Sequence, residues 1–171
     1  MALANSIGGS NTISLVAGCV YDVKAVNNNW YGPNGLPPVA NRLTIEGHGA
    51  TIVRDSAAPS FRLFYVGADP SSPDTPGYTS PGAGNLTLDE VTLSHGLAQG
   101  GDSNGGGGGA GMGGAIFNQG VLTVIGSTLT GNRAQGGSSV DATAGTGGGG
   151  MGTSSVGQLG GGFGSGSFGG A

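Results

Sequence analysis

The sequence has little of what many common folds and functions require. It holds a single cysteine, Cys19, among 171 residues, so no disulfide can join two parts of the chain. Charged residues make up 8% of the chain and aromatic residues 6%. Long stretches of alanine, leucine, glutamate and lysine, which favour helices, are also missing. These absences exclude a disulfide-stapled domain and argue against a helical protein.

Positive charge is scarce as well. The net charge is −4, and the five basic residues are scattered without interleaved aromatic residues, which argues against nucleic acid as a partner. No apolar run approaches the ~20 residues of a membrane span. The first ten residues, MALANSIGGS, lack the basic start and apolar centre of a signal peptide. Cys19 stands in the apolar stretch LVAGCVYDV, which predicts a buried small hydrophobic residue.

What is abundant is glycine, with 41 residues, and short apolar segments that repeat. LTIEGHGATIVRD begins at Leu43, LTLDEVTLSHG at Leu86 and LTVIGSTLTGN at Leu122. Each segment has a Leu-Thr-aliphatic strand, a polar or glycine break and a second short strand. Alternation of apolar and polar residues buries one face of each strand. The pattern predicts that these three leucines form one interior column on successive turns of a solenoid.

The fold predicted on this basis is all-β: a short right-handed parallel β-helix of about four coils. Its expected parts are an N-terminal lead over residues 1–12, a β-helix domain over 13–134 and a Gly/Ser-rich C-terminal segment over 135–171. FRLFYVG and GAIFNQG are predicted to supply the third strand of successive coils. The glycine-rich stretches are loops by composition, and glycine would let them pack tightly against the coil or against each other.

The stretch GGAIFNQGVLTVIGSTLTGNRAQGG, residues 113–137, resembles the repeats of bacterial right-handed parallel β-helix surface proteins. That group includes polymorphic outer membrane proteins and autotransporter-like adhesins. The upstream run from LVAGCVYDV to TIVRD looks like a first coil of the same group. The resemblance covers most of residues 10–137 and implies a secreted or cell-surface location, although no export signal is visible. It is weakly specific for function, because β-helices host lyases, adhesins and scaffolds alike.

Candidates for chemistry are few. Asp89 with Glu90, Asp55 beside Arg54, and His95 are the residues from which a polysaccharide lyase or hydrolase site could be built. Adjacent residues on a regular strand point to opposite faces, which weakens the pairing of Asp89 with Glu90. His48 and His95 each follow a strand next to glycine, as solvent-facing turn residues do. No catalytic, cofactor-binding or metal-binding set is therefore expected.

Three further groups of residues carry structural or binding expectations. Trp30 and Tyr31 could stack on sugar rings as a ligand site, but are expected more often to cover an open end of the coil. Asn118 and Asn132 stand where inward asparagines bond the backbone of an adjacent coil. The third group is an outward column of threonines in matching places of the three units: Thr51, Thr92 and Thr128.

Together these features predict a non-enzymatic structural or adhesive protein whose partner is a cell-surface glycan or a protein. One alternative is a subunit that stacks end to end through its open coil ends into a homo-oligomer or extracellular filament. A second alternative is a carbohydrate-active, lyase-like β-helix. Neither a cofactor nor a membrane span belongs to any of the three hypotheses.

Overall fold

In a computed structural model, residues 1–74, 79–139 and 147–155 are described, and almost all of their regular structure is β. The one helix there is short, α1 (Ala2–Ile7). The strands are β1 (Ser10–Ser14), β2 (Val20–Val23), β3 (Arg42–Glu46), β4 (Thr51–Arg54), β5 (Phe64–Val66), β6 (Asn85–Asp89), β7 (Thr92–Ser94), β8 (Leu97–Gln99), β9 (Ile116–Asn118), β10 (Val121–Ile125), β11 (Thr128–Thr130) and β12 (Arg133–Gln135). The prediction of an all-β chain is confirmed.

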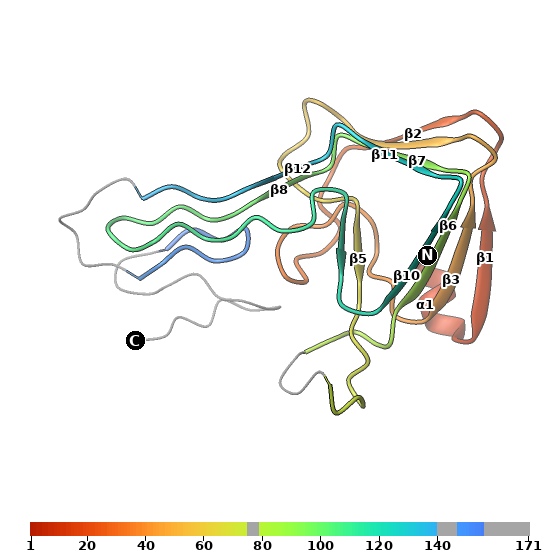
Figure 1. Ribbon diagram of the computed structural model, residues 1–171, viewed down its shortest axis with the longest axis horizontal. Helices are drawn as coiled ribbons and strands as arrows, with labels where there is room; N and C mark the ends of the chain where they lie inside the picture. Colours follow the sequence, from red (N-terminus) through yellow and green to blue (C-terminus); the bar gives the residue numbers. More distant parts are fainter. Residues whose placement is uncertain (75–78, 140–146, 156–171) are drawn as a thin grey trace.

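The strands form four sheets, and every strand pair in them is parallel. Sheet I has the order β1-β3-β6-β10, and sheet II has the order β2-β4-β7-β11. Sheet III pairs β5 with β9, and sheet IV pairs β8 with β12. Consecutive strands of the chain lie in different sheets, and each strand of sheet I is followed by one of sheet II. Figure 1 shows sheets I, II and III arranged around one interior.

The register of sheet I places the repeats on top of one another. Leu43 pairs with Leu86, and Leu86 pairs with Leu122. Alternation along each strand then separates two faces: Leu86 and Leu88 are fully buried in the core, while Thr87 between them lies on the outer face. In β3 and β6, the core is thus built from the second and fourth residue of the strand, and in β10 the second residue, Leu122, packs against it.

The outer face carries threonine columns. Thr51, Thr92 and Thr128 pair in register across sheet II, at the positions expected from the sequence. Sheet I has a second column, which runs through all four of its strands: Thr12, Thr44, Thr87 and Thr123. β-branched threonine suits an exposed pleated position, so both columns support the strands that hold them.

An asparagine ties neighbouring units together at the end of sheet II. The Asn132 side chain donates to the carbonyl of Leu93 (3.0 Å) and accepts from the amide of Gly96 (2.8 Å), both in the preceding unit. Asn118 instead accepts from the amide of Gly120 (3.2 Å) within its own turn. The predicted bond between units is therefore confirmed for Asn132 and wrong for Asn118, whose side chain is exposed at the end of β9.

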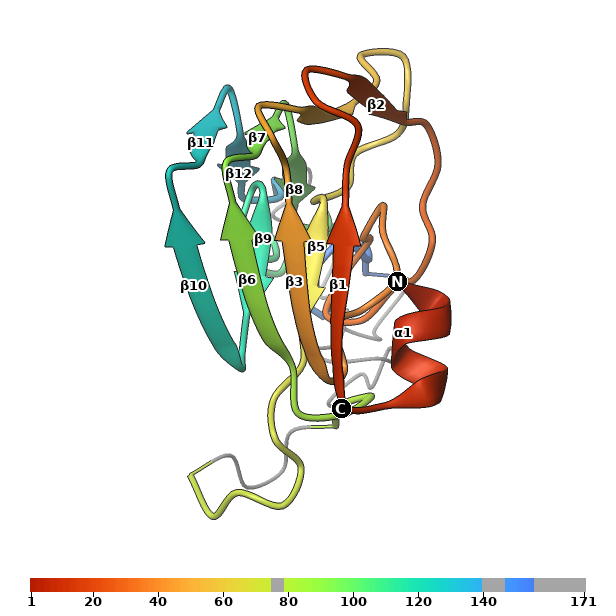
Figure 2. The same cartoon turned by 90° about the vertical axis from the view of Figure 1, so that its right-hand side faces the viewer.

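The N-terminal residues are more ordered than a simple lead. α1 lies beside β1, beyond the first strand of sheet I (Figure 2). Its buried residue Ala4 accepts hydrogen bonds through its carbonyl from Asn11 (3.3 Å) and Asn41 (2.6 Å). β1 begins at Ser10, before the expected domain start at residue 13. The helix thus covers this end of the molecule beside β1 (Figure 2).

Cys19 is exposed, so its predicted burial is wrong. It lies in the turn between β1 and β2, and both strands are at the edges of their sheets. Val16 and Val20 on either side of that turn are exposed for the same reason. Among the described residues, no strand pairs with the outer edge of β1 or β2. The apolar residues of this stretch therefore stay exposed.

The glycine-rich segments pack against each other. Residues 100–111, 136–139 and 147–155, here called the glycine bundle, run side by side away from sheet IV (Figure 1). The Gly101 amide donates to the Gly150 carbonyl (2.8 Å), and the Gly101 carbonyl accepts from the Gly109 amide (2.8 Å). Gly109 in turn accepts from the amide of Gly137 (2.8 Å). Backbone hydrogen bonds thus join three separate stretches of chain.

The bundle changes the expected domain limits. β12 ends at Gln135, the first residue of the predicted C-terminal segment, and it pairs with β8 of the preceding unit. Residues 136–139 and 147–155 continue from there into hydrogen bonds with residues 100–111. These parts of the segment therefore share one structure with the glycine-rich insert. The rest of the predicted segment, residues 140–146 and 156–171, lies outside the described residues.

Candidate functional site

The predicted ligand-stacking pair is used inside the protein. Tyr31 is 1% exposed and packs at 5.5 Å from the ring of Tyr65 and 5.7 Å from that of Phe117. Trp30 is half-buried, and its ring stacks on Tyr65 at 6.2 Å with an angle of 12°. With Met112 and Met151, these rings form a second apolar cluster on sheet III. The buried Tyr31 ring has no face free for a sugar, so the ligand-stacking prediction is wrong for it.

The cluster also does not lie at an open end of the stack. Tyr65 is the middle residue of β5, between Phe64 and Val66, which both point into the main core. Its side chain therefore lies on the opposite face of sheet III, and the loop that carries Trp30 and Tyr31 covers it. Trp30 and Tyr31 thus cover the outer face of sheet III. The expectation that they close an end of the coil is therefore wrong.

An arginine that sequence reasoning did not single out anchors this loop. Arg62 is 2% exposed, its Nη2 donates to the Tyr31 carbonyl (2.7 Å), and its guanidinium lies 4.9 Å from the centre of the Phe117 ring. Burial lowers the pKa of Arg62 to about 10, against a smaller raising effect of Tyr65. The signal in the sequence was an arginine inside the apolar run FRLFYV, where a charged residue needs a specific partner.

Tyr65 carries a pH prediction. Burial raises its pKa to about 12, and its hydroxyl donates to Gln119 (2.9 Å). Because the pKa is raised in the folded state, the contribution of Tyr65 to stability is complete below pH 10 and is lost between about pH 10 and pH 12. A titration of phenolate absorbance should show one ionisation near pH 12 that Tyr65→Phe removes. If the step survives in the variant, the assignment to Tyr65 fails.

The expected acid–base residues occupy turns. Asp89 ends β6, and Glu90 follows with a φ of 50°, which turns its exposed side chain out of the strand pattern. His48 (φ 50°) and His95 (φ 59°) adopt the same left-handed conformation at the ends of their strands. Both histidines are exposed turn residues, as their glycine neighbours indicate. Among the described residues, no three His, Cys, Asp or Glu side chains gather as metal ligands.

One pocket, of about 270 Å³, brings part of the predicted acid–base set together. It is lined by Asp22, Val53, Arg54, Asp55, Ser56 and His95. The Arg54 guanidinium donates hydrogen bonds to backbone carbonyls, including those of His95 (2.9 Å) and Ala58 (2.7 Å). The His95 Nδ1 lies 2.5 Å from the Ser94 hydroxyl. Asp22 was missed in the sequence, because only stacking brings β2 beside β4.

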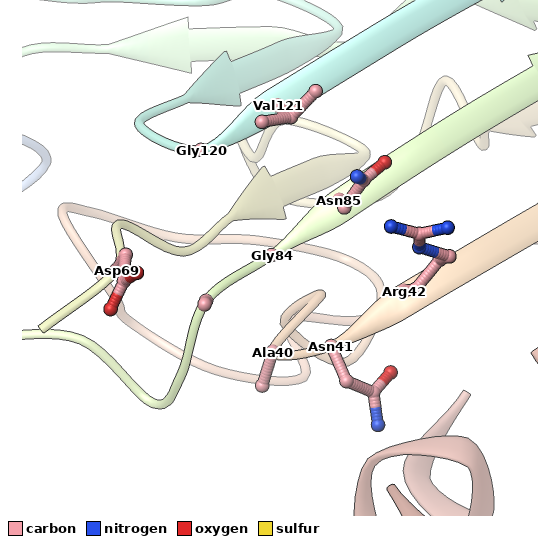
Figure 3. A pocket seen from close by; sticks show the side chains of 9 residues that line it. Ala40, Asn41, Arg42, Asp69, Gly84, Asn85, Gly120 and Val121 are labelled. Carbon is pink, nitrogen blue, oxygen red and sulfur yellow. The ribbon is translucent and has the colours of Figure 1, made fainter. Parts of the chain in front are cut away.

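A larger pocket, of about 450 Å³, opens where the strands of sheet I begin (Figure 3). Its polar side chains are Arg42 and Asn85, which are in register on β3 and β6, and Asp69 on the loop after β5. Asn41 also lines the pocket, but its amide points toward α1, where it bonds the Ala4 carbonyl. The floor between the polar groups is made by small residues and Val121: Ala40, Ala83, Gly84 and Gly120.

This pocket can make hydrogen bonds in both directions. Arg42 has guanidinium donors, Asn85 has an amide donor and acceptor, and Asp69 has a carboxylate whose Oδ1 accepts from Ser71. A side-chain hydrogen bond from Ser71 (2.6 Å) lowers the pKa of Asp69, so the carboxylate is ionised at neutral pH. No large hydrophobic wall is present among the residues that line it. The pocket thus combines hydrogen-bonding side chains with a lining of small residues and Val121.

The described part of the chain has no helix that is long and apolar enough to cross a membrane. Comparison of the sequence with protein-family models and with curated proteins, and of the structure with solved structures, finds no match. The function must therefore be argued from the geometry of this chain alone.

Proposed function

We propose that the chain is a short right-handed parallel β-helix of four coils and that it serves as a structural and adhesive part of a secreted or cell-surface protein. Support for the winding comes from the order of the sheets, because the chain visits sheet I and then sheet II four times, with every pair parallel. Parallel strands joined by a crossover connection are right-handed in about 98% of cases. This supports the right-handed form.

The proposed ligand is a glycan. The observation that carries the adhesive role is the pocket of Figure 3, in which Arg42 and Asn85 stand at positions fixed by the sheet I register. Sugar hydroxyls act as donors and acceptors at once, which matches an arginine, an asparagine and a carboxylate around a floor of small residues. The resemblance to β-helix surface proteins points the same way. The in-register strands of sheet I provide a rigid support for such a site.

A glycan array tests this proposal, with the chain compared with Arg42→Ala and with Arg133→Ala as a matched control. Arg133 is also an arginine on a strand, but it lies on β12 outside the pocket. We expect Arg42→Ala to weaken binding at least tenfold, which corresponds to the loss of one or two charge-assisted hydrogen bonds. Arg133→Ala should bind like the parent chain. Absence of glycan binding, or equal loss in both variants, would contradict the proposal.

The second candidate function is a carbohydrate-active enzyme, favoured by the gathering of Asp22, Asp55 and His95 at the smaller pocket. A pair of carboxylates near an ionisable group is the minimum that glycoside cleavage needs. A reducing-end assay on polysaccharides separates the two candidates. Release of reducing ends that disappears in Asp55→Asn would establish the enzyme, whereas binding without release supports the adhesive role.

A further inference from the structure

The last coil exposes residues that the previous coil buries. On the inward face of sheet I, Val124 of β10 is in register with Leu88 of β6. On the inward face of sheet II, Leu129 of β11 is in register with Leu93 of β7. Leu88 and Leu93 are 0% exposed, whereas Val124 is 45% and Leu129 is 47% exposed. The difference arises because no described strand pairs with the outer edge of β10 or β11. We call this surface, which consists of β10, β11 and the half-exposed side chains of Val124 and Leu129, the terminal face.

β10 is apolar on its outer side too. Val121 is 55% and Ile125 is 50% exposed. The residues in register with Val121 are Arg42 and Asn85, and those in register with Ile125 are Glu46 and Asp89. Edge strands of monomeric proteins are usually protected by charge, proline or a bulge, and β10 and β11 have no charged residue and no proline. A strand that is apolar on both faces is typical of one that is covered on both faces.

The opposite end of the stack is covered at sheet I, although the outer edge of β2 is unpaired among the described residues. Asn11 occupies the inward position in register with Leu43, and its amide donates to the carbonyls of Ala4 (3.3 Å) and Gly8 (3.0 Å). α1 lies over this end (Figure 2) and buries Ala4. Stacking the terminal face of one copy on β1 of another would require α1 to leave. This obstructs the open-ended filament that the sequence suggests as an alternative.

The β10 sequence, VLTVI, is complementary to itself. In an antiparallel pair centred on Thr123, Leu122 faces Val124 of the second copy and Val121 faces Ile125. Every such pair is apolar except the central threonines, and no like charges meet. A two-fold arrangement uses the same patch on both partners, so a patch that matches itself favours a closed dimer.

From these four observations we infer that two copies of the chain associate through their terminal faces, with β10 paired antiparallel to β10 across a two-fold axis. This arrangement continues sheet I across the dimer and covers Val124 and Leu129. The proposed pair and the glycan pocket share Val121, but the dimer does not need the polar side chains of the pocket, so Arg42→Ala should leave it intact.

Sedimentation analysis of the full chain over a wide concentration range tests the inference. We expect a species of twice the chain mass, and Val124→Glu should shift it to the monomer, since each carboxylate would lie unpaired against Leu122 of the second copy in an apolar interface. Thr12→Glu, a charge on the opposite end, should leave the dimer intact. Circular dichroism shows that each variant remains folded. A chain that stays monomeric at all concentrations, or one that grows without limit, overturns the inference.

Cross-linking tests the geometry directly. In a Cys19→Ser background, Thr123→Cys places two thiols opposite each other across the axis, within the reach of a disulfide. We expect an intermolecular disulfide under mild oxidation. The matched variant Thr12→Cys, in the same column but on β1, should give none. A cross-link only in a mixture of the two variants would show head-to-tail stacking and would contradict the two-fold pairing.

Discussion

Gly101→Ala is expected to open the glycine bundle. A Cβ atom added at Gly101 would lie 1.9 Å from the carbonyl oxygen of Thr153 and 2.6 Å from the amide nitrogen of Ser154. Both contacts are with backbone, which cannot swing aside as a flexible side chain can. Overpacking of this kind usually costs about 1–3 kcal/mol. Because Gly101 donates to Gly150 and accepts from Gly109, separation at this point breaks one bond to residues 147–155 and one within residues 100–111.

Hydrogen exchange measures the opening. In Gly101→Ala, amides of residues 100–111, 136–139 and 147–155 should exchange at least tenfold faster, while those of sheets I and II stay protected. Gly107→Ala is the matched control, since a Cβ atom added at Gly107 would have nothing within 4 Å. It changes the same residue type in the same bundle without a clash. Equal effects of the two substitutions would show that close backbone packing does not hold the bundle together.

Leu86→Ala should produce the largest loss of global stability. Leu86 is fully buried, and the strands on both sides place Leu43 and Leu122 against it. Removing three carbon atoms from the middle of this column leaves a cavity that two rigid neighbouring strands cannot collapse to fill. Substitutions of this kind cost about 2–5 kcal/mol. Denaturant or thermal unfolding followed by circular dichroism gives the value.

Leu3→Ala provides the comparison, because Leu3 is 72% exposed on α1. It removes the same atoms from a surface position, and its effect should stay within about 0.5 kcal/mol. If Leu86→Ala were equally mild, the interior column would not be the main source of stability, and the proposed winding would lose its support.

The parts of the fold that the sequence predicts are those with a side-chain pattern. Leu43, Leu86 and Leu122 are each the second residue of an alternating strand. Alternation specifies register, because a slip of one residue would turn every leucine outward. The threonines of sheet II follow from the same alternation. The order of the glycine bundle could not be predicted, because its contacts are between backbone groups and glycine carries no side chain that distinguishes one partner from another.

The sites were predicted less well than the strands. The smaller pocket contains Asp22 from β2, Arg54 from β4 and His95 after β7, so it exists only when three units are stacked. The aromatic pair illustrates a different limit. Trp30 and Tyr31 look accessible in a loop, but whether a loop aromatic is exposed depends on what it covers, and Tyr65 and Arg62 lie under them. Sequence spacing holds no information on that contact.

The two ends of sheet I differ, because α1 lies beside β1 (Figure 2) whereas no described strand pairs with the outer edge of β10. This difference bears on the order in which the strands assemble. α1 and β1 are synthesised first and can settle against each other and against β3, which then presents a finished edge on which β6 and β10 are laid in turn. Each of these strands pairs in parallel with the strand of sheet I that precedes it in the chain. We therefore expect the strands of sheet I to be added in chain order, from β1 to β10.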